Sequence, residues 1–130
     1  MQDIKLVILE TPYAGNVNAN VAYARRCLKD CADRGESAQA SHLLFTQVLN
    51  DKHPGERALG IALGLAWRRV ADYSVFYTDR GWSRGMLDAL LSAVDESRHV
   101  KLRALDGPVQ YPAKSDLPAE VAIVDWAFIQ

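Results

Sequence analysis

Short apolar runs alternate along this chain with longer segments in which apolar residues recur every three or four positions. The clearest short runs, rich in β-branched or aromatic residues or alternating with charged ones, predict strands at residues 4–9, 73–78 and 100–105. Less distinctive runs at 36–40 and 121–129 are further strand candidates. The segments with helical spacing predict helices at residues 16–34, 41–51, 54–70 and 83–96.

Particular residues indicate where these helices begin and end and which of their faces are apolar. Gly35 is placed to end the first helix, and Pro54 suits the first turn of the third. The third helix has an apolar stripe made of Leu59, Leu63, Ala66, Trp67 and Val70. Gly60 and Gly64 lower its helix propensity, which indicates close approach to a neighbouring element. In the fourth helix we expect the inward-facing residues to be Leu87, Leu90, Leu91 and Val94.

Strands that alternate with helices favour right-handed βαβ units and a mainly parallel sheet. The predicted fold class is therefore α/β, a small flavodoxin-like or Rossmann-like three-layer sandwich. We expect residues 1–130 to form a single domain, with its core at about 4–105. The remaining segment, 106–130, contains three prolines between 107 and 118 and is expected to start as an extended surface connection.

Charge and cysteine content narrow the class of protein. The 15 Lys and Arg residues nearly balance the 16 Asp and Glu residues, so the composition gives no indication of nucleic-acid binding. No apolar run is long enough to span a bilayer, and no secretory signal pattern is visible. Cys27 and Cys31 are interpreted as buried, reduced thiols. We expect a cytoplasmic protein without membrane association.

Two polar, glycine-containing turns follow predicted strands, at 11–16 and 79–86. In a parallel sheet the carboxyl ends of the strands share one edge, where ligands bind. We therefore expect five residues of these turns to converge on one small-molecule cleft, namely Tyr13, Gly15, Asp79, Ser83 and Gly85. The pattern is neither a dinucleotide fingerprint nor a phosphate-binding P-loop, because the required glycines and the Gly-Lys-Ser/Thr sequence are absent.

Each turn residue has a functional and a purely structural interpretation. Tyr13 either stacks on a base or sugar or packs at the rim, and Gly15 can present a free N–H to an oxyanion. Asp79 either hydrogen bonds a sugar hydroxyl or base edge or forms the turn. Ser83 is a good N-cap, and Gly85 lets a ligand approach the first helical turn.

Two further polar residues leave similar alternatives. Arg84 meets a phosphate or carboxylate, or is a solvated residue at the helix start. His42 is either a hydrogen-bonding residue of the pocket or a structural residue. The three histidines lack the spacing of metal ligands, so we expect neither a metal nor a cofactor.

The motifs around these turns resemble a known family. They are Pro12-Tyr13-Ala14-Gly15, then Asn20, Tyr23 and Arg25, then Ala40-Ser41-His42-Leu43-Leu44 with Thr46-Gln47, then Gly60-Ile61, Trp67, Ala71-Asp72 and Asp79-x-Gly-x-Ser-x-Gly-Met86. Over about residues 4–105 the chain is similar to nucleoside 2-deoxyribosyltransferase-like proteins, and more closely to small phage and prophage proteins of unknown function with that outline.

The resemblance implies a nucleoside or nucleotide ligand and a homo-oligomer. In the transferases a Tyr of the first turn, an Asp after the middle strand and a Glu in the next helix form the site, and the Glu attacks the anomeric carbon. Tyr13 and Asp79 match such positions, but the Glu has no match, and Asp88 is the nearest carboxylate. The catalytic candidates are therefore Asp88 and Asp79. The resemblance adds four ligand-binding candidates, Asn20, Arg25, His42 and Met86, to the turn residues.

Three classes of function remain open at this point. The protein cleaves or transfers an N-glycosidic bond, or it binds the same ligand without turnover, for example as a phage-encoded sensor, or it is an interaction protein with a vestigial pocket. A carboxylate directed into the pocket would distinguish an enzyme from a binding module.

Overall fold

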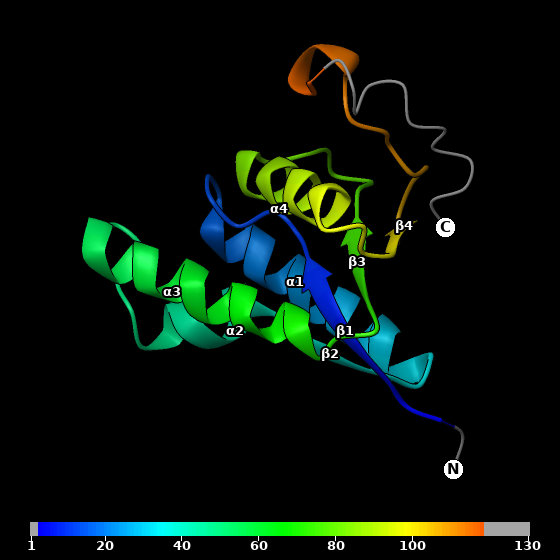
Figure 1. The fold of residues 1–130 in the computed structure, drawn as a ribbon, viewed down its shortest axis with the longest axis horizontal. Coiled ribbons are helices and arrows are strands. Elements are labelled where there is room, and N and C mark those ends of the chain that lie inside the picture. Colours follow the sequence, from blue (N-terminus) through cyan, green and yellow to red (C-terminus); the bar gives the residue numbers. More distant parts are fainter. Residues whose placement is uncertain (1–2, 119–130) are drawn as a thin grey trace.

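A computed structural model describes residues 3–118 of the chain. Its four strands are β1 (Lys5–Glu10), β2 (Glu36–Gln39), β3 (Tyr73–Tyr77) and β4 (Val100–Arg103), all parallel and in the order β2-β1-β3-β4 (Figure 1). The predicted α/β class with a parallel sheet is confirmed. The strand candidate at 121–129 lies outside the described residues.

Four α-helices and three short 3-10 turns connect and cover the strands. The helices are α1 (Val17–Asp33), α2 (Ser41–Leu44), α3 (Pro54–Ala66) and α4 (Arg84–Asp95), and the 3-10 turns are η1 (Phe45–Gln47), η2 (Trp67–Arg69) and η3 (Lys114–Asp116). The helix predicted at 41–51 is thus a single turn of α-helix followed by η1, and the helix predicted at 54–70 ends at Ala66. None of the helices described in residues 3–118 has the length and apolar character needed to cross a membrane.

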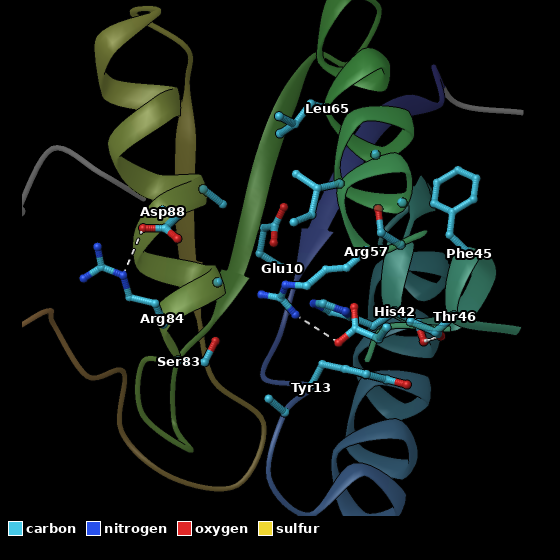
Figure 2. A pocket seen from close by; sticks show the side chains of 18 of the residues that line it. Glu10, Tyr13, His42, Phe45, Thr46, Arg57, Leu65, Ser83, Arg84 and Asp88 are labelled. Atoms are coloured by element: carbon cyan, nitrogen blue, oxygen red, sulfur yellow. Dashed lines mark hydrogen bonds and ion pairs between the residues drawn. The ribbon is translucent and has the colours of Figure 1, made fainter. Parts of the chain in front are cut away.

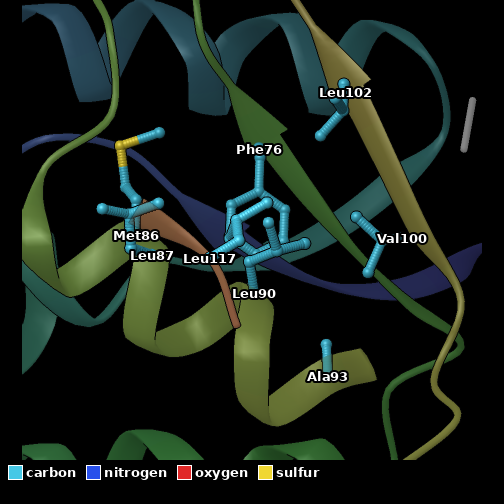
Figure 3. Packing of buried hydrophobic residues seen from close by; sticks show 8 residues of the cluster. All are labelled: Phe76, Met86, Leu87, Leu90, Ala93, Val100, Leu102 and Leu117. Atoms are coloured by element: carbon cyan, nitrogen blue, oxygen red, sulfur yellow. The ribbon is translucent and has the colours of Figure 1, made fainter. Parts of the chain in front are cut away.

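The helices lie on both faces of the sheet because alternate strand residues point to opposite sides. On one face the strand residues Val7, Leu9, Val75 and Tyr77 form a cluster with Tyr23, Cys27 and Cys31 of α1. On the other face Phe76, Val100 and Leu102 pack against α4 (Figure 3). The fully buried residues of α4 are Met86, Leu90 and Ala93, while Leu91 and Val94 pack at the edge of that cluster.

Helix α3 packs beside α2 and η1 and has no buried residue (Figure 1). Its glycines face these neighbours, as predicted: a Cβ on Gly64 would lie 2.5 Å from the Ser41 Oγ, and one on Gly60 would lie 3.6 Å from Leu49. The predicted apolar stripe, however, remains exposed to solvent, at 48% for Leu59 and 40% for Leu63 of α3, and at 46% for Trp67 and 58% for Val70 beyond its end. A helix this apolar is usually buried, so the stripe lacks a partner within residues 3–118.

The α1 face also buries an ion pair. The Arg103 guanidinium donates two hydrogen bonds to the Glu36 carboxylate, from Nη1 to Oε1 at 2.6 Å and from Nη2 to Oε2 at 2.7 Å. The Tyr73 hydroxyl donates to the same carboxylate, and the Tyr77 hydroxyl donates to Asp30 of α1 at 2.6 Å. This network ties β2, β3, β4 and α1 together beneath the apolar cluster.

Candidate functional site

A cavity of about 320 Å³ lies beside β1, between α3 and α4 (Figure 2). It is lined by segments that follow three different strands: Tyr13 after β1, His42 after β2 and Ser83 after β3. The chain runs from β1 outward to β2 and then crosses to β3 on the other side of β1. The cavity therefore occupies the topological switch point, where open α/β sheets bind their ligands.

The turn after β1 is held in place by α1. The Asn20 amide donates hydrogen bonds to the carbonyl oxygens of Tyr13, at 2.9 Å, and Ala14, at 3.0 Å. The Asn16 side chain caps α1 by accepting from the Ala19 N–H at 3.2 Å. Gly15 has a φ of +98°, which a residue with a side chain rarely adopts. Asn20 and Gly15 thus shape the turn, which presents Tyr13 and Ala14 to the cavity.

Tyr13 and His42 form a stacked pair at one side of the cavity. Their ring centroids are 4.8 Å apart and their planes differ by 10°. Burial is the main factor that lowers the pKa of His42, so its imidazole is neutral at physiological pH. The pair offers an aromatic surface with polar edges. Within residues 3–118, no three His, Cys, Asp or Glu side chains are grouped so that they could hold a metal ion.

The start of α4 forms the opposite side of the cavity. The Ser83 hydroxyl caps the helix by accepting from the Met86 N–H at 3.2 Å, and Gly85 adds no side chain to the wall. Arg84 lies 3.3 Å from the carboxylate of Asp88, and both residues line the cavity (Figure 2). The Met86 side chain points instead into the core under α4.

Asp79 does not line the cavity, although we predicted that it would. Its carboxylate accepts hydrogen bonds from the Tyr23 hydroxyl and, at 2.9 Å, from the Asp106 N–H. Burial opposes ionisation of Asp79, but these bonds outweigh it and lower its pKa. Asp79 therefore joins β3 to α1 and to the loop after β4. Arg25 is exposed on α1 and also lies outside the cavity lining, as do Gly15 and Asn20.

Glu10 is a cavity residue that the sequence analysis missed. It ends β1, and its carboxyl lies between α3 and α4 (Figure 2). Burial raises its pKa to about 7, although the positive charges of Arg68 and Arg98 oppose the rise. The available signal was a single carboxylate at the end of an apolar strand, two residues before Pro12. A carboxyl with a perturbed pKa in a cavity is typical of a functional site.

Comparisons with known proteins agree with this fold. The family model described as "Domain of unknown function (DUF7768)" matches residues 5–103. A solved structure of a 2-deoxyribosyltransferase from the psychrotolerant bacterium Bacillus psychrosaccharolyticus is similar to this chain with a TM-score of 0.65 and 14% sequence identity, over 95% of each chain. No curated protein matches the chain significantly. At this identity the likeness shows a deoxyribosyltransferase-like fold.

Proposed function

We propose that this chain, which belongs to the family described as Domain of unknown function (DUF7768), binds a nucleoside or nucleotide in the cavity between α3 and α4. The observation that carries the proposal is the position of the cavity at the topological switch point, with the Tyr13–His42 pair on its wall. An aromatic face suits a nucleoside because it can stack on a base or pack against a sugar ring. The similar solved structure is named as an enzyme for nucleoside synthesis, which favours this ligand class.

Polar groups at the cavity suit the rest of such a ligand. Ser83, Arg84 and Arg57 line it, and Arg57 is paired with Asp51 at 3.0 Å. A hydroxyl and two guanidinium groups are appropriate partners for sugar hydroxyls or a phosphate. The same residue types would not be expected around a purely hydrophobic ligand.

Cleavage or transfer of an N-glycosidic bond is the reaction that we associate with this site, with Asp88 as the candidate nucleophile. Asp88 lines the cavity, but its side chain is 59% exposed and paired with Arg84. An aspartate is also shorter than the glutamate of the transferases. We therefore expect slow turnover, and the alternative function is a phage or prophage protein that binds the ligand without catalysis.

The test combines ligand identification with variants. Mass spectrometry of small molecules released from the purified protein should detect a nucleoside or nucleotide, and members of that class should raise the melting temperature. Substituting Tyr13→Ala should abolish the thermal shift, whereas Tyr111→Ala, at an exposed tyrosine outside the cavity lining, should preserve it. Absence of any shift across nucleosides and nucleotides would refute the proposal.

We further propose that the protein is a homo-oligomer. The exposed apolar stripe, made of Leu59 and Leu63 of α3 with Trp67 and Val70 beyond its end, supports this, because large apolar side chains are costly to leave in water. A two-fold contact between copies of α3 would bury the stripe of each helix against the other.

A further inference from the structure

The cavity has two chemically different ends. The rim, formed by Tyr13, His42, Ser83 and Arg84, contains the turns that follow the strands. The inner end contains Glu10 and Leu65, which lie farther from these turns (Figure 2), and Arg68 and Ser92 also line the cavity. Apolar residues also line the cavity, among them Ile8, Ile61 and Ala89. A flat apolar group with a polar edge therefore fits the inner end, and hydroxyl or phosphate groups fit the rim.

The Glu10 carboxyl is available to a ligand. Among residues 3–118 it has neither a hydrogen bond nor an ion pair within 4.0 Å, and its side chain is partly exposed to solvent. Its two cationic neighbours have other partners, although Nη1 of Arg98 is buried without a hydrogen bond. Arg68 donates to Ser92 and lies 3.7 Å from Glu96, while Arg98 donates to Ser74 at 2.7 Å. A carboxyl that is partly withdrawn from water without a partner is unfavourable, and a ligand that hydrogen bonds to it would reduce that cost.

Several charged groups surround this carboxyl from different elements. Arg68 of η2 and Arg98, which precedes β4, favour its ionised form, but burial dominates. Across the cavity, α4 contributes Asp88 with its partner Arg84, and α3 contributes Arg57 with its partner Asp51. With a pKa of about 7, Glu10 is present in both protonation states near neutral pH.

We propose, on the basis of the proposed function, that a nucleoside enters this cavity base first and that Glu10 hydrogen bonds the edge of its base. A neutral carboxyl has one donor and one acceptor, which match an edge with the same combination, such as the N1 and amino group of adenine. A carboxylate only accepts, and it matches the N1–H and amino group of guanine, where two donors are adjacent. The protonation state of Glu10 then determines which base is bound.

This assignment gives opposite expectations for two ligands. The affinity for an adenine nucleoside should fall about tenfold between about pH 6 and about pH 8, in proportion to the neutral fraction of a carboxyl with a pKa of about 7. The affinity for a guanine nucleoside should instead rise about tenfold over the same range, in proportion to the ionised fraction. His42 has a lowered pKa and stays largely neutral from about pH 7 upward, so it does not account for the part of the difference above pH 7.

The experiment is calorimetric titration of the full chain with 2′-deoxyadenosine and with 2′-deoxyguanosine at both pH values. Substituting Glu10→Gln fixes one donor and one acceptor, so the affinity for deoxyadenosine should become independent of pH and match the wild type at low pH. Substituting Glu10→Leu should weaken both ligands at least tenfold. Substituting Asp95→Asn, which removes an exposed carboxylate of α4 outside the cavity lining, should leave the wild-type pH dependence unchanged. Melting curves show whether each variant is folded.

The outcomes separate the two proposals. Wild-type affinity for deoxyadenosine that does not change with pH, or a pH dependence that survives in Glu10→Gln, would overturn the role of Glu10 while leaving nucleoside binding intact. If neither nucleoside binds the wild type at either pH, the proposed function and the role of Glu10 both fall.

Discussion

Replacing Arg103 with methionine tests the buried ion pair that joins β4 to β2. The Arg103 side chain is 10% exposed and the Glu36 side chain 4%, so neither charge is well solvated. Methionine replaces the aliphatic stem of Arg103 but leaves the Glu36 carboxylate with the Tyr73 hydroxyl as its remaining strong donor. Removing one partner of a buried pair typically lowers the free energy of unfolding by about 3–5 kcal/mol. Since single domains have about 5–15 kcal/mol in total, we expect Arg103→Met to be severely destabilised.

Urea unfolding, monitored by tryptophan fluorescence, measures this loss. Trp82 stacks on the core residue Phe76 with ring centroids 5.5 Å apart, so its emission should report on the loss of packing. The matched control is Arg34→Met, since Arg34 pairs with Asp30 at 3.1 Å on the surface, with 50% of its side chain exposed. We expect that substitution to cost less than about 1 kcal/mol. Equal effects of the two substitutions would refute the reasoning.

The pH dependence provides a second check. Burial alone would raise the pKa of Glu36, but the hydrogen bonds from Arg103 and Tyr73 outweigh it and lower the pKa in the wild type. The ion pair therefore stabilises the protein above the unfolded pKa of a glutamate, and this contribution is lost as the pH falls through the lowered folded value. In Arg103→Met the Glu36 pKa should instead be raised. The difference between variant and wild type should then shrink as the pH falls, and a constant difference would contradict the mechanism.

Three further predictions concern the helices around the cavity. Substituting Gly64→Ala should lower the melting temperature, because the new Cβ would lie 2.5 Å from the Ser41 Oγ. In a Ser41→Ala background the same substitution should raise the free energy of unfolding by up to about 1 kcal/mol, because alanine has the higher helix propensity. Substituting Leu63→Asp should yield a folded monomer in light scattering, and an unchanged mass would exclude the α3 stripe as the oligomer contact. Exchange of the base of a deoxynucleoside, followed by chromatography, should be weak or absent. Robust exchange that Asp88→Ala abolishes would identify Asp88 as an effective nucleophile.

The local sequence pattern predicted the strands and helices correctly where an element buries one of its faces in the core. The run before Pro12 and the aromatic run at 73–78 form adjacent parallel strands because their composition suits only a buried strand. The prediction of a single helix at 41–51 was wrong. The chain leaves α-helical geometry after Leu44, and η1 packs against α3. That packing depends on Gly60 and Gly64, which are distant in sequence, so no local signal could give it.

The cavity was only partly predictable, because a strand end determines an edge of the sheet but not the direction of a side chain. Tyr13 and Ser83 lie at the cavity because both follow strands that end at the same edge. Asp79 follows the same strand as Ser83, yet its carboxylate is bound by Tyr23 on the other side of the sheet. Glu10 shares a face with Ile8, which period-2 alternation implies, but only the tertiary structure shows that α3 and α4 leave a space there.

The two cysteines of α1 have a consequence for measuring how the protein opens. Cys27 and Cys31 are free and have no exposed surface, and burial is the main factor that raises the pKa of both thiols, to about 12 for Cys27. Since only the thiolate reacts with alkylating reagents, labelling requires the α1 face to separate from the sheet. The rate of alkylation in native buffer therefore gives the frequency of that opening without denaturant, and a bound ligand that tightens the structure would slow it.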